Sequence, residues 1–573
     1  MMSNETNIQT YTFHHAELGS MTGIVTPDNV VQFRAIPYAS IPARFEKSIL
    51  LDHLPDQSRD YTAHGFASPQ IFPDRATDGG PFPGDPEFPP SDEFQCLILQ
   101  LNVPLHILES RSSNNLDSPS AEKLPLLVYI HGGGFILGRI DEQHTTALMV
   151  SQSASDGEPV IGASIQYRLG ALGYLHTPSR GHANLALNDQ RNALRWLQRF
   201  AAGFGGDRRK VTVFGESAGS MSICAHLLAP PPREGPLFHR AVLMSGPLGP
   251  ASAPAPLQHG EARYAAFLAE LGIEERGDEG LRKARAAHID DVVAASAALG
   301  DKGGLWLSVQ DQDFFGPAAE TMTWDRVPEL IAQQDWCNDF VLGCTSFEAL
   351  TFSQRYKHVR PADFLASLSA LHGPRAASSI ALTYNISSSS PDPSPVAFHT
   401  PLLRWLGDTL FDAPMHLLAR HLSAAPSKRV YRYLFDVRNP FPGQPLYAQP
   451  HHWADIYFVF RAHQFRYPGG PAGGEGDRLR GISDAHARFW TRFARGEAPW
   501  RVYEKGEGEG DEIIMLVGER EGWVERSAKQ LERDLGWGYG RCEALVRAWE
   551  EAGLRGKSER VLQLECLAGV PQT

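Results

Sequence analysis

The 573-residue sequence predicts an α/β fold in which a mostly parallel central sheet is flanked by helices and carries large loop and helical insertions. Two observations predict this fold class. Short apolar runs rich in β-branched residues recur along the chain, and stretches with helical spacing separate them. Strands that are apolar on both faces are typical of parallel sheets, because helices cover both sides of such sheets.

The strands that the sequence predicts are six apolar runs, at residues 124–131, 160–167, 211–215, 241–246, 339–345 and 430–437. A helix is expected between the second and the third run. Its apolar side chains recur at i, i+3 and i+4, which indicates one face packed on the sheet. They are Ala193, Trp196, Leu197, Phe200, Ala201 and Phe204.

The alternating series of strands and helices has no clear linker, so we expect one domain over residues 1–573. The segments at residues 73–90, 387–395 and 468–476 are rich in Gly, Pro or Ser and are expected to be surface insertions. After Trp500 the chain becomes more charged, and a helical pattern runs from residue 526 to 567. We therefore expect a C-terminal cap of helices within the domain, over residues from about 520 to 573.

Charge and terminal composition limit the partners of the protein. The 53 basic and 66 acidic side chains give a formal net charge of −13, without a basic block interleaved with aromatics, so nucleic acid is not an expected partner. Residues 1–12 lack the basic and apolar regions of a secretory signal, and the apolar run at residues 124–130 is too short to cross a bilayer. We expect a cytoplasmic protein without a transmembrane segment; the sequence leaves the oligomeric state open.

The cysteines indicate neither a zinc site nor a disulfide framework. Six are scattered along the chain without C-x-x-C spacing, and we expect them to be reduced. They are Cys96, Cys224, Cys337, Cys344, Cys542 and Cys566.

The strongest local motif is G-E-S-A-G at residues 215–219, which follows a β-like run and precedes a helical stretch. A serine on such a strand–turn–helix is the nucleophile of a nucleophile elbow. The flanking glycines leave room for the turn to close and for a carbonyl group to approach Ser217. The turn also places Ser217 at a helix N-terminus, where backbone N–H groups favour negative charge. The alternative is a serine in an ordinary strand-to-helix loop.

A second motif, H-G-G-G-F at residues 131–135, directly follows the apolar run that ends at Ile130. A glycine-rich loop at this place can direct backbone N–H groups at an oxyanion. The expected donors of this oxyanion hole are Gly133 and Gly134, together with Ala218. A turn chosen only for backbone freedom is the alternative, but the presence of both motifs in one chain favours a shared site.

A serine nucleophile needs a base, and the 22 histidines offer many candidates. In proteins with this elbow the triad follows the chain order serine, acid, histidine, which favours a histidine beyond the last core strand. His452 fits, and its neighbour His451 fits equally well on the residue pattern alone. Glu348 is the candidate acid because it follows the run at residues 339–345, at the edge where catalytic loops of parallel sheets lie. A solvated loop glutamate is the alternative.

These motifs together resemble the type-B carboxylesterase/cholinesterase family, which has the α/β-hydrolase fold, from about residue 19 to about residue 500. Four further stretches resemble family signatures in the same order. They are Q-Y-R-L-G-A-L-G-Y at residues 166–174, N-D-Q-R-N-A-L-R-W at 188–196, F-G-G-D at 204–207 and L-F-H-R-A-V-L-M-S-G at 237–246.

The resemblance implies a catalytic triad of Ser217, Glu348 and His452. In family members the acid lies five residues after a glycine that ends a strand, which here is Gly343. The triad histidine precedes an acidic residue by three positions, which selects His452, before Asp455, over His451.

The sequence departs from the family at several positions. Residues 91–97 keep the family cysteine, Cys96, but residues 66–70 lack the cysteine that commonly pairs with it. The first disulfide of secreted members is therefore expected to be absent, which agrees with an intracellular location. Ala349 and Trp453 stand where glycine is common, which bears on the shape of the loops. The overall pattern is similar to intracellular fungal members.

The resemblance implies a serine carboxylesterase that hydrolyses small-molecule carboxylic esters through an acyl-enzyme on Ser217, without a metal or cofactor. One alternative is a transacylase, lactonase or related acyl-transfer enzyme acting on a secondary metabolite, because exclusion of water from the pocket would decide between them. A third possibility is a non-catalytic binding protein similar to cholinesterases. The presence of all three triad residues argues against it.

Overall fold

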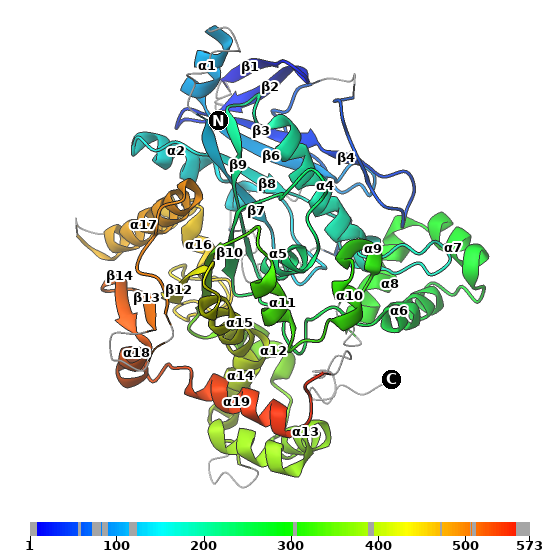
Figure 1. Ribbon diagram of the computed structural model, residues 1–573, viewed down its shortest axis with the longest axis vertical. Helices are drawn as coiled ribbons and strands as arrows, with labels where there is room; N and C mark the ends of the chain where they lie inside the picture. Colours follow the sequence, from blue (N-terminus) through cyan, green and yellow to red (C-terminus); the bar gives the residue numbers. More distant parts are fainter. Residues whose placement is uncertain are drawn as a thin grey trace.

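The computed structural model describes residues 9–55, 59–71, 82, 90–113, 123–301, 306–387, 395–469, 473–504, 506 and 512–556. A 12-stranded sheet runs through the molecule in the order β1-β2-β3-β6-β8-β7-β9-β10-β11-β12-β13-β14 (Figure 1). Its strands are β1 Thr10–His15, β2 Gly19–Val25, β3 Val30–Pro37, β6 Ile98–Pro104, β7 Leu124–Ile130, β8 Ile161–Ile165, β9 Gly206–Glu216, β10 Arg240–Met244, β11 Asp339–Thr345, β12 Arg429–Asp436, β13 Ile513–Gly518 and β14 Gly522–Ser527. A separate two-stranded sheet joins β4 Ala39–Ser40 to β5 Ile49–Leu50.

The centre of the large sheet is parallel, as predicted. From β8 through β7, β9, β10, β11 and β12 to β13, every neighbouring pair of strands is parallel. Each of the six predicted runs forms one of these strands. The two edges were not predicted. In the order β1, β2, β3, β6 and β8 each strand pairs antiparallel with the next, and at the other edge β14 pairs antiparallel with β13.

The predicted apolar runs are continuous because both faces of the sheet are buried. On β7, the side chains of Leu126, Val128 and Ile130 join the apolar core that contains α4 Leu185–Phe200 and α5 Ala218–Leu228. The alternate side chains of the same strand, Leu127 and Tyr129, join a second core with α16 Ile456–Val459 and α17 Glu475–Arg495. Successive side chains of a strand point to opposite faces, so one strand contributes to both cores.

Long helical segments connect neighbouring strands of the sheet at two places in the chain (Figure 1). Between β10 and β11 lie α6 Leu257–Glu270, α7 Gly277–Ala286, α8 Ile289–Asp301, α9 Gln312–Phe315, α10 Ala318–Thr321 and α11 Val327–Gln333. Between β11 and β12 lie α12 Ser353–Tyr356, α13 Pro361–Thr383, α14 Pro395–Gly407, the π-helix η3 Asp408–Asp412 and α15 Ala413–Ala424. The other helices are α1 Leu105–Ser113, α2 Ala147–Ser155, α3 Gly170–Tyr174, α18 Ala528–Leu535 and α19 Gly540–Glu551. The two helical segments between β10 and β12 are insertions of the kind predicted for this α/β fold.

The C-terminal region, where the sequence predicts a helical cap over residues from about 520 to 573, holds two helices and also a strand that was not predicted. Residues 522–527 form the strand β14, and the helices α18 and α19 follow it. The side chains of β14 are mostly half-buried, so this strand carries no continuous apolar run that would reveal it. Residues 557–573 lie outside the described part of the chain, as do most of the predicted insertions at residues 73–90 and 387–395. In the third insertion, residues 470–472 also lie outside it, and α17 begins at Glu475.

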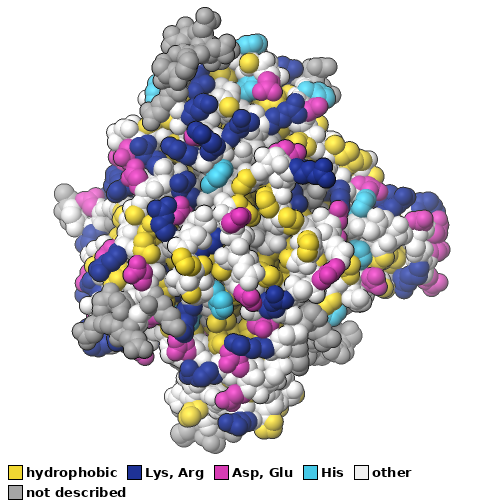
Figure 2. Space-filling view, in the orientation of Figure 1, with side chains coloured by type: hydrophobic (Ala, Val, Ile, Leu, Met, Phe, Trp, Pro, Cys, Tyr) yellow, Lys and Arg dark blue, Asp and Glu magenta, His cyan; other side chains and the backbone are white. Residues whose placement is uncertain are grey.

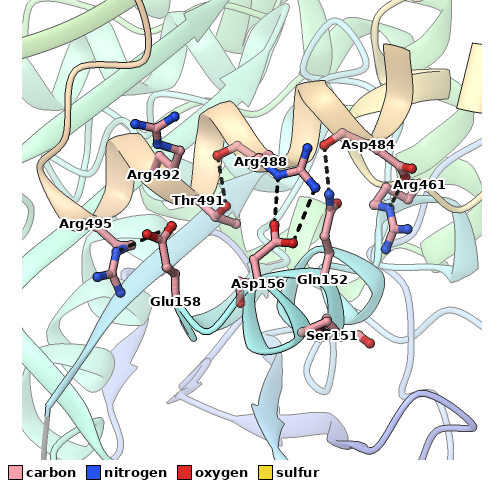
Figure 3. Close-up of polar contacts among 12 residues, drawn as sticks. Ser151, Gln152, Asp156, Glu158, Arg461, Asp484, Arg488, Thr491, Arg492 and Arg495 are labelled. Carbon is pink, nitrogen blue, oxygen red and sulfur yellow. Dashed lines mark hydrogen bonds and ion pairs between the residues drawn. The ribbon is translucent and has the colours of Figure 1, made fainter. Parts of the chain in front are cut away.

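Helices α2 and α17 lie side by side and are joined by polar contacts (Figure 3). Gln152 Nε2 donates to the backbone oxygen of Asp484 at 3.0 Å, and Arg488 Nε donates to Asp156 Oδ2 at 2.9 Å. Arg461 connects both helices, because its guanidinium donates to Asp484 Oδ1 and to the backbone oxygen of Leu148, each at 2.9 Å. Through Arg461, the segment between β12 and α17 is attached to both helices.

Charged side chains of both signs are interspersed over most of the face shown in Figure 2. Within the described ranges, no helix is both long and apolar enough to span a membrane. The described cysteines, Cys96, Cys224, Cys337, Cys344 and Cys542, are buried free thiols.

Candidate active site

Ser217 occupies the turn between β9 and α5, as the elbow motif predicts. Its backbone has φ 53° and ψ −121°, a conformation that is strained for a residue with a side chain. Two backbone hydrogen bonds hold the turn: the N–H of Ser217 donates to Met244 O, and the N–H of Met221 donates to Ser217 O, both at 2.9 Å. The strain presents the half-buried serine side chain above the end of the sheet.

Glycines surround the elbow because neighbouring backbones approach it closely. A Cβ atom on Gly219 would lie 2.0 Å from Ile130 O, and one on Gly246 would lie 2.1 Å from Ser217 O. A Cβ on Gly132 would lie 3.2 Å from the Cβ of Ser217 and 2.7 Å from the backbone oxygen of Glu216. Three segments, after β7, β9 and β10, therefore meet at Ser217 with no room for larger residues.

The structure brings Glu348 and His452 into direct contact. His452 Nδ1 lies 2.5 Å from Glu348 Oε2, and both side chains are buried. The other carboxylate oxygen of Glu348 accepts from Ser245 Oγ at 2.7 Å and from the backbone N–H of Thr345 at 2.6 Å. These hydrogen bonds stabilise a carboxylate that is removed from water, and they fix its direction toward the imidazole.

His451, which the residue pattern could not separate from His452, has different surroundings. Its Nδ1 accepts the N–H of Trp453 at 3.2 Å, and its ring packs against Tyr457. Burial, with a smaller contribution from the neighbouring His452, lowers the pKa of His451 to about 3. His451 is therefore a neutral core side chain, whereas its neighbour contacts the candidate acid.

The second ring nitrogen of His452 faces Glu216, which sequence reasoning did not single out. His452 Nε2 lies 3.1 Å from Glu216 Oε1, and within the described residues no hydrogen bond joins Nε2 to Ser217 Oγ. Ser217 nevertheless lies close to the carboxylate of Glu216. Both border the same point beside Gly132, since a Cβ atom there would lie 2.6 Å from Glu216 Oε2 and 3.2 Å from the Cβ of Ser217. One indication in the sequence that Glu216 lies in the site was its position directly before Ser217 in the motif.

The glycine loop has the conformation that its residues allow. Gly133 has φ 101° and Gly134 has φ 60°, both in the left-handed region that favours glycine. The backbone oxygen of Gly133 accepts from the N–H groups of Ile136 and Leu137, at 3.1 and 3.0 Å, which closes the loop into a tight turn. Ala218 is the first residue of α5, where backbone N–H groups have no acceptor within the helix. All three expected oxyanion donors thus lie in segments that border Ser217.

The base of the glycine loop is rigid. His131 stacks on Tyr167 with ring centroids 4.3 Å apart, and Tyr167 donates its hydroxyl to His131 O at 2.7 Å. Burial lowers the pKa of His131 to about 4, which keeps its ring neutral. At the far end of the loop, the side-chain amide of Gln70 exchanges two hydrogen bonds of 2.9 Å with the backbone of Gly138.

Asp455 is buried, and the charges of Glu348 and His452 act on it. Its carboxylate accepts the hydroxyl of Tyr433 at 2.9 Å and is fully buried. Burial first, and the negative charge of Glu348 second, raise the pKa of Asp455 to about 7. The ring of Tyr433 also explains why residue 343 is a glycine, since a Cβ atom at this position would lie 2.0 Å from a ring carbon of Tyr433.

A π-helix that the sequence did not predict covers His452. In η3, the ring centroid of Phe411 lies 4.4 Å from that of His452. The first residue of η3, Asp408, accepts from Tyr384 Oη at 2.8 Å and from Arg541 Nε of α19 at 3.0 Å. A π-turn arises from an i→i+5 hydrogen bond inside a helical stretch, so the apolar periodicity of the sequence gives little signal for it.

Within the described ranges, no group of three or more His, Cys, Asp or Glu side chains is arranged to hold a metal ion.

The sequence profile of the carboxylesterase family matches residues 10–513. The chain belongs to the carboxylesterase family. It is accordingly a carboxylic ester hydrolase of the serine hydrolase type. Because the match ends at residue 513, β14 and the helices α18 and α19 lie beyond it.

Two relatives with curated functions align with most of this carboxylesterase. The para-nitrobenzyl esterase of Bacillus subtilis (strain 168) is 32% identical over 462 residues, which cover 78% of this chain and 82% of the relative. The phenmedipham hydrolase of Pseudarthrobacter oxydans is 29% identical over 527 residues, which cover 89% of this chain and 96% of the relative.

A solved structure of a PNB esterase has the same fold, with a TM-score of 0.68 and 25% sequence identity, and covers 91% of this chain and 99% of the PNB esterase chain. The α/β-hydrolase fold predicted from the motifs is therefore confirmed, and so is the family.

Proposed function

We propose that this carboxylesterase hydrolyses small-molecule carboxylic esters through an acyl-enzyme on Ser217. Glu348 and His452 complete the triad, and the N–H groups of Gly133, Gly134 and Ala218 form the oxyanion hole. The observation that carries the proposal is the contact of 2.5 Å between His452 Nδ1 and Glu348 Oε2, beside a serine held at φ 53° on the elbow.

In the first half of the reaction, His452 Nε2 removes the hydroxyl proton of Ser217 as Oγ attacks the ester carbonyl carbon. The carbonyl oxygen becomes an oxyanion that accepts hydrogen bonds from the glycine loop and from the start of α5. Glu348 stabilises the imidazolium. When the C–O bond breaks, the alcohol leaves with the proton from Nε2, and the acyl group remains on Ser217.

In the second half, water takes the place of the alcohol and the same groups act again. Nε2 removes a proton from water, the hydroxide attacks the acyl-enzyme, and the proton returns to Ser217 Oγ as the acid departs. Catalytic hydrogen bonds often form only when substrate is bound, so we propose that Nε2 turns from Glu216 toward Ser217 in the substrate complex. Glu216 then remains close enough to stabilise the imidazolium as well.

The relatives support the proposal and suggest assay substrates. The two relatives are a para-nitrobenzyl esterase and a phenmedipham hydrolase. Chromogenic aryl esters are therefore suitable first substrates. Transfer of the acyl group to a second alcohol instead of water is the alternative activity, and product analysis in the presence of added alcohols distinguishes the two.

The test compares wild type with Ser217→Ala, using p-nitrophenyl acetate and butyrate and a fluorophosphonate label. We expect the substitution to abolish labelling and to lower kcat by about 10⁴-fold or more. His452→Ala and His451→Asn form a matched pair: only the former should lose activity. If Ser217→Ala hydrolyses esters and labels like wild type, the proposed mechanism is wrong.

A cytoplasmic location is also part of this proposal. The five described cysteines are buried free thiols, a pattern typical of reducing compartments. Fractionation of cells that produce the protein would test it, and recovery in the culture medium would contradict it.

A further inference from the structure

Helices α15 and α19 lie side by side (Figure 1), and a groove runs between them. Its volume of about 480 Å³ is within the range of small-molecule sites, about 300–1,000 Å³. The groove shares no lining residue with the triad or the glycine loop, so it is separate from the candidate active site. Helix α15 contributes His416, Leu417 and Arg420 to the lining, and α19 contributes Glu543, Val546 and Arg547.

His416 is a buried lining residue whose polar atoms have no partner. Its side chain is 1% exposed, and its ring stacks on Tyr539 with the ring centroids 4.0 Å apart. In the part of the chain that the structure describes, neither ring nitrogen makes a hydrogen bond, and Oε1 of Glu543 lies 3.7 Å from Nε2. Buried polar groups normally have a hydrogen-bond partner. A ligand in the groove can supply the missing one.

The protonation state of His416 fits a hydrogen-bond donor. Burial is the main cause that lowers the pKa of His416 to about 4, so the ring is neutral at pH 7. A neutral imidazole still carries one N–H group. An acceptor in the groove can therefore bind this N–H without any change in the charge of the ring.

The carboxylates of the lining are already engaged. Glu543 accepts from Arg420 at 2.7 Å, and Glu550 is paired with Arg555. Arg547 has the weakest contact: its guanidinium lies 3.9 Å from Glu543, and its side chain is 64% exposed. Three guanidinium groups thus share two carboxylates, and the least engaged charge is positive. The groove therefore favours an anion over a cation.

Apolar side chains line the groove beside these charges. Leu417 of α15 is half-buried, and Val546 of α19 is buried directly before Arg547. A carboxylate matches the planar guanidinium group of arginine, and an attached hydrocarbon body can contact the two apolar side chains. An inorganic anion has no such body, so the lining fits an organic carboxylate better.

The end of the groove beyond α19 is attached to another segment of the chain. Leu554 O accepts the indole N–H of Trp324 at 2.8 Å, and the N–H of Gly556 donates to Asp325 Oδ1 at 3.1 Å. Arg555, which also lines the groove, lies between these two contacts. Its backbone is therefore held in place before a ligand binds, which lowers the entropy lost on binding.

We propose that the groove between α15 and α19 binds an organic carboxylate. The carboxylate group accepts hydrogen bonds from Arg547 and from the ring N–H of His416, and the apolar body packs against Leu417 and Val546. The inference goes beyond the proposed function and does not depend on the chemistry of Ser217.

The chain offers a matched control for each test variant. Arg547 is 64% exposed in α19, and Arg533 is 65% exposed in α18, outside the groove. His372 of α13 is, like His416, a buried histidine without a hydrogen-bond partner in the described structure. The Arg→Gln and His→Phe substitutions thus make the same chemical change at two places in the fold.

The measurement is the dissociation constant of hexanoate for the full-length protein, by ligand-observed NMR titration. Hexylamine, a cation of the same length, and inorganic phosphate serve as comparison ligands, and each should bind at least about tenfold more weakly. Arg547→Gln and His416→Phe should each weaken hexanoate binding by about tenfold, because hydrogen bonds to charged groups have effects of this size.

The control variants Arg533→Gln and His372→Phe should keep the wild-type affinity. The thermal unfolding midpoint of His416→Phe without ligand should not fall, since the substitution keeps the ring and removes no hydrogen bond of the protein. If both groove variants bind hexanoate as wild type does, or if hexylamine or phosphate binds as tightly as hexanoate, the inference is wrong. Ester hydrolysis and fluorophosphonate labelling test the proposed function separately, so either proposal can fail while the other stands.

Discussion

One methyl group added at Gly132 is expected to separate the glycine loop from the nucleophile. The Cβ atom of Gly132→Ala would lie 2.7 Å from the backbone oxygen of Glu216 and 3.2 Å from the Cβ of Ser217. The backbone oxygen cannot rotate away as a flexible side chain can. The loop and the elbow must therefore move apart.

The size of this movement gives the expected loss of activity. Relief of the contact with Glu216 O requires about 0.7 Å, from 2.7 Å to the 3.4 Å at which ordinary contact begins. Catalytic groups tolerate displacements of about 0.5 Å, and an error of about 1 Å can cost about 100-fold. Loss of a single oxyanion donor costs about 10²–10³-fold in kcat. We therefore expect kcat/KM of Gly132→Ala to fall by about 10²-fold.

The assay is hydrolysis of p-nitrophenyl acetate, with the rate of fluorophosphonate labelling as a second readout, since both depend on the oxyanion hole. Circular dichroism and the midpoint of thermal unfolding verify the fold. The matched control is Gly481→Ala in α17, where nothing lies within 4 Å of the added methyl group. Alanine is the better helix former by about 1 kcal/mol, so this control should be active and at least as stable as wild type.

Full activity in a folded Gly132→Ala protein would refute the close approach of the glycine loop to Ser217. If Gly132→Ala folds only in part, the rate of fluorophosphonate labelling of the folded fraction is the test. Slow labelling supports the close approach of the glycine loop to Ser217, and labelling at the wild-type rate contradicts it.

Two further predictions concern buried charges. The pKa of Asp455, raised to about 7 by burial and by Glu348, means that the folded protein holds a proton that the unfolded chain releases above about pH 4. Stability from this group is complete below that pH and is lost as the pH rises through 7, by up to about 4 kcal/mol. Denaturant unfolding at pH 5 and pH 8 should show the part of this loss that lies above pH 5, about 3 kcal/mol, in wild type but not in Asp455→Asn. Equal losses in both proteins would contradict the prediction. The second prediction is that Arg541→Met, which removes a partner of the buried Asp408, lowers the free energy of unfolding by about 1–3 kcal/mol. The loss is smaller than for a fully buried pair because the side chain of Arg541 is partly exposed. The exposed pair of Arg282 and Glu279 is the control. Arg282→Met should lower the free energy of unfolding much less than Arg541→Met, because water screens this pair, and a similar loss for both variants would show that α19 does not support η3.

Much of the fold could be predicted because its signals are local. A strand buried on both faces must be apolar throughout, so the central parallel strands are visible in the sequence. The elbow is visible for a similar reason, since its strained serine needs small neighbours, which leaves glycines at fixed spacing. The strands β1, β2 and β14 are partly exposed, and β3 and β6 are buried but carry polar residues such as Gln32, Gln100 and Asn102. None of them is a continuous apolar run, and their identity depends on the neighbour with which they pair.

The site divides in the same way. The sequence by itself determined Ser217 and the glycine loop, because each reflects the conformation of a short segment. The residue pattern alone left His452 and His451 open, and the family resemblance favoured His452; the tertiary structure places the ring of His452 against Glu348 and the ring of His451 in the core. The contacts of Glu216 and Phe411 with His452, and of Ser245 with Glu348, likewise arise between segments far apart in the chain. Conformational preferences are encoded locally, whereas these contacts depend on how distant segments pack, which no short stretch of sequence specifies.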